Sequence, residues 1–167
     1  MDDETAIEKC RNGEQEAFRH LVERYQRQAL GHATTILGSR DDAQDAAQEA
    51  FIDAFRALKN FDSSRPFYPW FYVLLRNRCY KIAARKRETE SMDEAVIVAS
   101  DTARSEEIRA LENALLSLDM EDREILTLKY FDGLSYNELA ERLQIPKGTV
   151  MSRLFHARGK LQAKLER

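Results

Sequence analysis

The sequence predicts an all-α protein built from two small helical domains. Apolar residues recur at three- and four-residue spacing through most of the 167-residue chain. Only 6 glycines and 3 prolines interrupt this spacing. An acidic, weakly periodic stretch at 88–104 separates two periodic regions, so we expect domains at 1–87 and 105–167 joined by a flexible acidic linker.

Two long helices and a basic third helix are predicted in the N-terminal domain. Residues 14–37 have helical spacing and end before Gly38, a plausible C-terminal stop. Residues 41–60 form the cleanest amphipathic pattern, and residues 61–69 contain two prolines and two serines, which predicts a loop. Residues 70–87 then predict a helix with an apolar start and a basic end. The apolar face expected for 41–60 consists of Ala43, Ala47, Ala50, Phe51, Ala54, Phe55 and Leu58.

The C-terminal domain is predicted to contain a helix-turn-helix. One helix begins at Ser105 and another covers 119–131. A short helix at 135–143 opens on a capping box, and the turn 144–146 leads into a longer helix at 147–161. An ordinary helical hairpin with a solvated basic face is the alternative, which the capping box and the proline in the turn make less favourable. The residues expected to face outward on the longer helix are Lys147, Thr149, Met151, Ser152, Arg153, His156, Arg158 and Lys160.

Residues 61–87 combine aromatic rings with cations, although the chain carries a net charge of −3. This block holds seven Arg/Lys residues and one acid. Rings can stack on unpaired bases while cations hold the backbone, and the loop 60–67 could receive one extruded base. Core packing is the competing interpretation, favoured for Trp70 and Phe71 and left open for Phe61 and Tyr68. The cations expected along one helix are Arg76, Arg78, Lys81, Arg85, Lys86 and Arg87.

Several classes of function find no support in the sequence. Cys10 and Cys79 are far apart and are expected to be reduced thiols. The sequence contains no signal-peptide pattern, no membrane-spanning apolar run, no glycine-rich phosphate loop and no metal-ligand cluster. We therefore expect a cytoplasmic protein that is not an enzyme and uses no cofactor, metal or small-molecule substrate.

Three motifs in this order resemble the extracytoplasmic-function sigma factors of bacterial RNA polymerase. These are DDAQDAAQEAFIDAFRAL, FYPWFYVLLRNRCYKIAARKR and LDMEDREILTLKYFDGLSYNELAERLQIPKGTVMSRLFHARGKL. The resemblance implies a sigma2-like N-terminal domain and a sigma4-like C-terminal domain. It implies binding to core polymerase, including the β′ clamp helices and the β subunit, and to promoter DNA. It also implies control by an anti-sigma factor.

The resemblance assigns roles to specific positions. It implies polymerase binding by Asp41, Asp42, Asp45, Gln48 and Glu49. It implies minus-ten recognition and opening by Asn60, Phe61, Ser63, Ser64, Asn77, Arg78, Lys81 and Arg85. It implies minus-thirty-five recognition by Lys147, Thr149, Met151, Ser152, Arg153, Phe155, His156 and Arg158.

The sequence departs from the family at three places. Met151 and His156 stand where the family often has Arg or Lys, and Asp119-Met120 replaces a usual Leu-Pro. A stand-alone helix-turn-helix regulator that binds operator DNA as a dimer is the runner-up. No spare apolar helix face for a two-fold contact is evident in the sequence, which favours the sigma factor.

Overall fold

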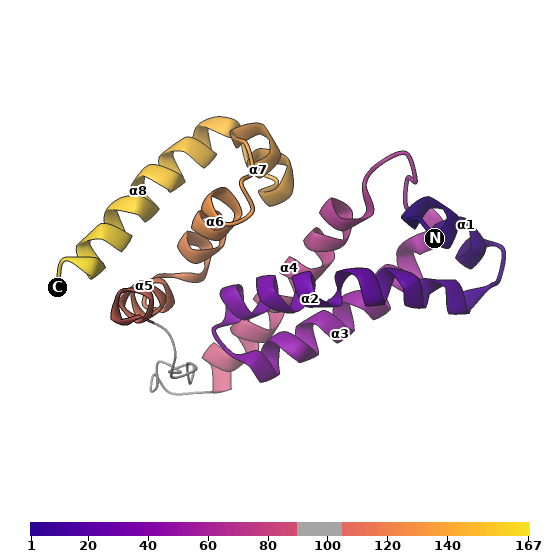
Figure 1. The fold of residues 1–167 in the computed structure, drawn as a ribbon, viewed down its shortest axis with the longest axis horizontal. Helices are drawn as coiled ribbons and strands as arrows, with labels where there is room; N and C mark the ends of the chain where they lie inside the picture. The colour runs from indigo at the N-terminus through magenta and orange to yellow at the C-terminus, as the bar shows by residue number, and fades with distance from the viewer. Residues whose placement is uncertain (90–104) are drawn as a thin grey trace. The chain divides into compact units, whose positions relative to one another are not determined.

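The computed structural model describes residues 1–89 and 105–167, which form two compact helical units (Figure 1). No strand occurs within these two ranges, so the all-α prediction is confirmed for them. Most of the predicted linker, at 90–104, lies outside the described residues. The two units are described separately below.

The first unit contains four α-helices and two short 3₁₀ segments. Asp2 caps the first helix by accepting a hydrogen bond from the backbone N–H of Thr5 at 2.8 Å. This helix was not predicted, because its nine residues are too few to establish an apolar period. The elements are α1 (Asp3–Arg11), η1 (Gln15–Ala17), α2 (Phe18–Leu37), α3 (Arg40–Ala57), η2 (Leu58–Asn60) and α4 (Phe67–Thr89).

Helix α4 begins three residues before its predicted start at Trp70. Pro69 lies in its first turn, where a missing N–H costs nothing because that group has no intrahelical partner. The proline therefore belongs to the first turn of the helix instead of preceding it. As a result, Phe67 and Tyr68 join Phe71 on the buried face of α4.

Rings from α3 and α4 form the core of the first unit. Phe71 is fully buried and stacks on Phe51 with ring centroids 4.4 Å apart. Phe61 is 5% exposed and packs against Trp70 at 4.6 Å. Core packing is thus the correct interpretation for most of these rings, including Phe61 and Tyr68. The α3 face is mostly alanine, which lets α4 approach closely; its buried residues are Ala43, Ala46, Ala47, Ala50, Phe51 and Ala54.

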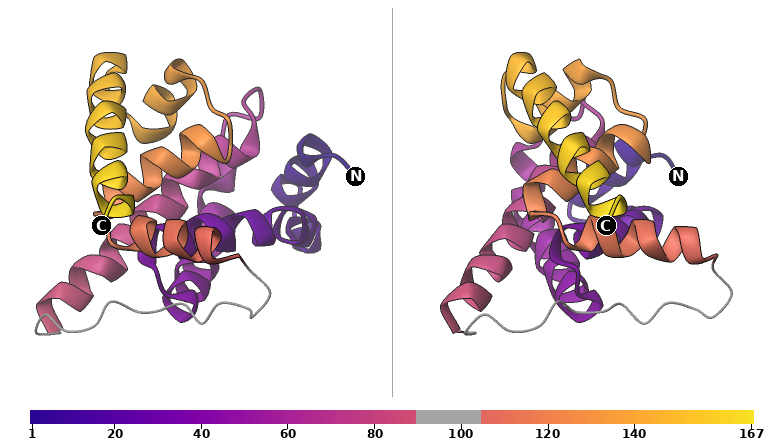
Figure 2. Two further views of the ribbon diagram at one scale, coloured as in Figure 1. Left: turned by 60° about the vertical axis from the view of Figure 1, so that its left-hand side comes forward. Right: turned by 90° about the vertical axis from the view of Figure 1, so that its left-hand side faces the viewer.

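The second unit contains the predicted helix-turn-helix, with α8 beside α6 and α7 in both views of Figure 2. Gln144 adopts a left-handed conformation (φ 55°) in the turn between α7 and α8. Helix α8 continues four residues beyond its predicted end at Leu161. The helices are α5 (Glu106–Leu116), α6 (Met120–Tyr130), α7 (Tyr136–Leu143) and α8 (Lys147–Leu165). Their shared core contains Ile125, Leu128, Leu139, Val150 and Leu154.

The predicted capping box is present at the start of α7. The backbone N–H of Glu138 donates to the Ser135 hydroxyl at 3.2 Å, and the backbone N–H of Ser135 donates to the Glu138 carboxylate at 2.7 Å. The pKa of Glu138 lies below its usual value because the ionised carboxylate accepts this backbone hydrogen bond. The box satisfies two N–H groups that would otherwise have no partner in a helix of only eight residues.

Replacing Ser135 with alanine removes the hydroxyl acceptor of this box. We expect Ser135→Ala to lower the free energy of unfolding by about 1 kcal/mol. Chemical denaturation followed by far-ultraviolet circular dichroism measures this loss. Ser152→Ala is the matched control, because Ser152 is an exposed interior residue of α8 and caps no helix. Equal denaturation midpoints for the two variants would contradict the capping role.

Candidate nucleic-acid interface

Five of the six cations predicted along α4 fall into two groups, and the sixth, Arg76, lies over the Tyr80 ring at 4.3 Å from its centroid. Lys81, Arg85 and Arg87 are exposed, and none of them makes an ion pair within residues 1–89 and 105–167. Arg78 and Lys86 instead contact carboxylates of α3. The exposed group lies toward the C-terminal half of the helix and can meet a phosphate backbone without first breaking a contact.

Arg78 connects α4 to α3 through two carboxylates. Its Nε and Nη2 atoms donate to Asp53 at 2.5 and 2.7 Å, and Nη1 donates to Glu49 at 2.9 Å. The hydrogen bond from Arg78 is the largest cause of the lowered pKa of Asp53, so this carboxylate stays ionised. The guanidinium predicted to hold DNA is thus occupied by its own chain, which corrects the expectation of a free cation at this position.

The predicted polymerase-binding residues also divide between two faces of α3. Asp41, Asp45 and Gln48 are exposed on the outer face. Asp42 pairs with Lys86, and Glu49 pairs with Arg78, so these two acids face α4. The family resemblance grouped all five, whereas the packing of α4 separates them.

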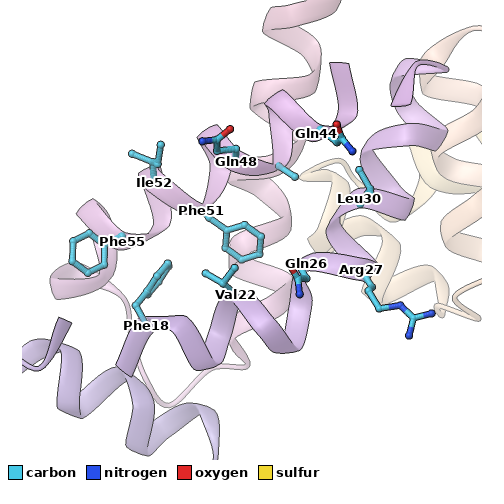
Figure 3. A pocket seen from close by; sticks show the side chains of 11 residues that line it. Phe18, Val22, Gln26, Arg27, Leu30, Gln44, Gln48, Phe51, Ile52 and Phe55 are labelled. Carbon is cyan, nitrogen blue, oxygen red and sulfur yellow. The ribbon is translucent and has the colours of Figure 1, made fainter. Parts of the chain in front are cut away.

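An apolar groove of about 670 Å³ lies between α2 and α3 (Figure 3). Phe18 on α2 meets Phe55 on α3 edge to face, with centroids 5.2 Å apart. Phe55, which was predicted on the apolar face of 41–60, is 36% exposed, and Ile52 is 43% exposed. Gln48 lies on the rim of this groove. Exposed apolar side chains beside polar ones are typical of a surface that receives a helix.

Ile52 was missed by sequence reasoning. It lies off the apolar stripe of α3, on the same side as Gln48. A large apolar residue on the polar arc of an amphipathic helix is the signal that could have identified this surface.

The loop before α4 forms a defined turn. The Asp62 carboxylate accepts hydrogen bonds from the backbone N–H and the hydroxyl of Ser64, at 3.0 and 2.7 Å. These bonds lower the pKa of Asp62. Asn60 and Ser64 are exposed and Ser63 is partly exposed. The Phe61 ring, in contrast, belongs to the core, so a stacking role for this ring is contradicted by its burial.

Three of the cations predicted on the outer face of α8 also contact α6. Arg158 donates to the Tyr130 hydroxyl at 3.0 Å, and Lys160 donates to Asp122 at 2.6 Å. Arg153 lies 3.9 Å from a carboxylate oxygen of Glu121. These contacts join α8 to α6, while Arg158 and Lys160 remain exposed and Arg153 is partly exposed. The exposed residues of the N-terminal half are Lys147, Gly148, Met151, Ser152, Phe155 and His156.

Large apolar side chains lie on the exposed face of α8 that does not contact α6. Phe155 is 69% exposed and Met151 is 51% exposed. The rings of Phe155 and His156 are 5.5 Å apart, edge to face. Thr149 is partly exposed beside them. Such a face suits contact with base edges and thymine methyl groups more than contact with phosphates.

A second apolar groove lies among α5, α6 and α8. Leu111, Leu115 and Leu126 line it, together with Tyr130 on its edge. Phe131, directly after α6, is 70% exposed. The C-terminal unit therefore offers a protein-docking surface separate from the outer face of α8.

Within 1–89 and 105–167, no cluster of His, Cys, Asp or Glu is arranged to hold a metal ion. None of the helices described is both long enough and apolar enough to span a membrane. Cys10 and Cys79 are free thiols.

Comparison with known proteins gives the class of this fold. The family model described as Sigma-70 region 2 matches residues 21–89, and the model described as Sigma-70, region 4 matches residues 108–161. These ranges coincide with the helical bundle that carries the α4 cations and with the helix-turn-helix unit. The two units are therefore those of the sigma-70 family.

The relatives narrow the class further. The chain is 35% identical to the RNA polymerase sigma-H factor of Pseudomonas aeruginosa, over 98% of this chain and 94% of that protein. It is 34% identical to the ECF RNA polymerase sigma-E factor of Escherichia coli K12, over 99% and 95%. The chain belongs to the extracytoplasmic-function group of the sigma-70 family and is an RNA polymerase sigma factor.

Solved structures of sigma factors have the same fold. The sigma factor RpoE in complex with the anti-sigma factor NepR from Bartonella quintana matches with a TM-score of 0.75 and 25% identity, over 89% of this chain and 96% of that one. CnrH in complex with the cytosolic domain of CnrY matches with a TM-score of 0.67 and 28% identity, over 98% and 97%. An engineered region 2 of sigmaE in complex with GTAAAA matches with a TM-score of 0.51 and 33% identity, over 55% and 96%.

The Asp53–Arg78 contact predicts a pH dependence of stability. Because the pKa of Asp53 is lowered in the folded state, the contact stabilises the fold above the usual value of 3.8 and loses this effect as the pH falls below it. We expect Asp53→Asn to destabilise the protein by about 1 kcal/mol at neutral pH and progressively less below pH ~4. Urea unfolding at a series of pH values measures this, with Asp45→Asn on the exposed face as the control. A difference that does not depend on pH would exclude the ionised contact as its source.

Proposed function

We propose that this sigma factor directs core RNA polymerase to promoters by using its two units on two DNA elements. The first unit opens the minus-ten element, and α8 of the second unit reads the minus-thirty-five element in duplex DNA. The observation that carries this proposal is the exposed row of cations in the C-terminal half of α4, a helix that follows a polar loop, in a unit that matches region 2. The polymerase performs the chemistry in the cytoplasm, and this chain contributes no catalytic residue.

The minus-ten role depends on the loop 60–66 and the exposed side of α4. Asn60, Ser63 and Ser64 offer an amide and hydroxyls for hydrogen bonds to an extruded base. Lys81 and Arg85 hold the strand that leaves this loop, with exposed Asn77 beside them. The relative solved in complex with GTAAAA supports this assignment, because region 2 is the part of that protein present. In this proposal Arg78 holds α4 in place and does not bind DNA.

The minus-thirty-five role depends on the N-terminal half of α8. Ser152, Thr149 and His156 can exchange hydrogen bonds with base edges in the major groove. Met151 and Phe155 supply apolar contacts beside them. Lys147 holds a phosphate where the helix enters the groove.

Two apolar surfaces are proposed to bind the polymerase. The α2–α3 groove and the outer face of α3 receive the clamp helices of the β′ subunit, with Ile52 and Phe55 as apolar contacts and Asp41, Asp45 and Gln48 as polar ones. The groove among α5, α6 and α8 is proposed for the β subunit. An anti-sigma factor that covers such surfaces would keep this chain from the polymerase, and the structurally similar sigma factor RpoE of Bartonella quintana was solved in complex with an anti-sigma factor.

The polymerase contact is tested by placing positive charges on the outer face of α3. We expect Asp45→Lys combined with Gln48→Lys to weaken binding to core polymerase by at least about tenfold, because both residues lie at the proposed contact. Fluorescence anisotropy of the labelled protein titrated with core polymerase measures affinity, and reconstituted transcription measures initiation. Unlike these variants, Glu8→Lys changes an exposed acid on α1 and should leave both measurements unchanged. Wild-type protein that binds promoter DNA without core polymerase would contradict the proposed function.

Strand opening is tested on the exposed cations of α4. We expect Lys81→Glu combined with Arg85→Glu to leave core binding unchanged and to reduce opening of the minus-ten element by more than about tenfold. Permanganate reactivity of unpaired thymines in the promoter complex measures opening. The matched control reverses Arg109 and Lys164, two exposed cations of the second unit. Normal opening by the Lys81/Arg85 variant would remove these residues from the minus-ten site.

A further inference from the structure

The end of helix α1 lies against the loop that follows α3. Arg11 is the last residue of α1, and the chain turns after it through Gly13, whose φ of 101° favours glycine. This turn leaves the Arg11 side chain directed at η2, 47 residues further along the chain. Arg11 had no role in the sequence-based predictions, because nothing in its local spacing indicates such a distant partner.

The Arg11 guanidinium binds the backbone of this segment at two points. Its Nε and Nη2 atoms donate to the Leu58 carbonyl at 3.3 and 3.2 Å, and Nη2 also donates to the Phe61 carbonyl. Nη1 lies 3.5 Å from the Ser63 hydroxyl. The Leu58 carbonyl also accepts the backbone N–H of Phe61 at 3.3 Å. A planar guanidinium can bind this carbonyl and the Phe61 carbonyl at once. One side chain therefore fixes where η2 ends and where the loop begins.

The rest of the loop is held by two further contacts. The Phe61 ring packs on Trp70 of α4, and the Asp62 carboxylate closes the turn by accepting two hydrogen bonds from Ser64. The backbone N–H of Arg65 donates to the Asp62 carbonyl at 3.1 Å. Arg11 adds a contact from α1, so the loop is held by its own residues, by α4 and by α1. The exposed atoms of Ser63 and Ser64 thus belong to a preformed turn.

We propose that Arg11 is a positioning residue for recognition of the melted strand. It holds the loop 60–66 in the shape that receives an extruded base. This inference rests on the proposed function of that loop. A loop that is ordered before binding loses less conformational entropy when the base enters. Because the donors of Arg11 are directed at carbonyls of its own chain, its contribution comes through the loop and not through a DNA phosphate.

The test compares binding of intact and abasic DNA by the complete polymerase holoenzyme. The DNA is a forked promoter with a single-stranded minus-ten element, in which each position in turn lacks its base. For wild-type protein, we expect one position where the missing base weakens binding. Arg11→Met should lower this discrimination by about tenfold, because the loop no longer presents its polar groups in a fixed geometry. Core polymerase affinity and binding to minus-thirty-five duplex should stay at wild-type values.

Arg24→Met is the matched control. Arg24 donates to Asp3 at 2.8 Å and so joins α2 to α1 without contacting the loop. We expect this variant to keep wild-type discrimination. Equal loss of discrimination in both variants would show that only the attachment of α1 matters, and would overturn the specific role of Arg11.

The Arg11→Lys variant distinguishes a positioning role of Arg11 from a role of its positive charge alone. Lysine keeps the positive charge but cannot reproduce the planar fork, so we expect little recovery of discrimination. Full recovery, together with a weaker salt dependence of DNA binding in Arg11→Met, would overturn the proposal in favour of a direct phosphate contact. If Arg11→Met does not fold, Arg11→Gln is measured instead, with hydrogen exchange of the amides from Leu58 to Arg65 expected to accelerate selectively. Unchanged exchange at these amides would contradict the positioning role.

Failure of the inference and failure of the proposed function give different results. Wild-type discrimination that persists in Arg11→Met would overturn the role of Arg11 and leave the role of the loop intact. No discrimination at any position in the wild-type protein would overturn the proposed role of the loop, and the role of Arg11 with it.

Discussion

The first unit depends on the close packing of α4 against the alanine face of α3. Small side chains on α3 leave room for Phe71 to stack on Phe51, and the other rings of α4 surround this contact. Burial of these rings fixes the rotation of α4 about its axis. The rotation in turn decides which cations of α4 meet the carboxylates of α3 and which remain in water. The proposed nucleic-acid surface of this unit is therefore a consequence of its apolar core.

Because α4 packs on α3 in this rotation, some charges of the two helices pair with one another and others remain exposed to water. Asp42, Glu49 and Asp53 neutralise cations of α4 along the seam between the helices. Lys81 and Arg85 have no such partners among the described residues, so their charge is available to a polyanion even though the whole chain is acidic. Exposed ion pairs of this type contribute little stability each, but they specify how the two helices align.

In the C-terminal unit, the residues that attach α8 to α6 likewise differ from those proposed to contact bases. Arg158 and Lys160 attach the sides of α8 to α6, and the face between them carries Phe155 and Met151. Arg158 contacts a neutral hydroxyl and remains exposed, so its charge is not neutralised by this contact. Sequence recognition then rests on hydrogen bonds and apolar contacts to the bases, and the apolar groove on α5 and α6 remains free for protein contacts.

The sequence by itself determined the elements whose signals are local. The apolar period predicted α2, α3 and the helices of the second unit, the Ser135–Glu138 spacing predicted the capping box, and the order of the motifs predicted the family. Only the tertiary structure decided that Phe61 is buried, that Phe55 and Ile52 are exposed, that Arg78 is paired and that Arg11 holds a loop 47 residues away. The physical reason is that a period of 3.6 residues specifies which side chains share a helix face, but not which distant group that face will meet. That choice depends on how the helices pack, and it determined which of the predicted site residues are available to DNA or polymerase.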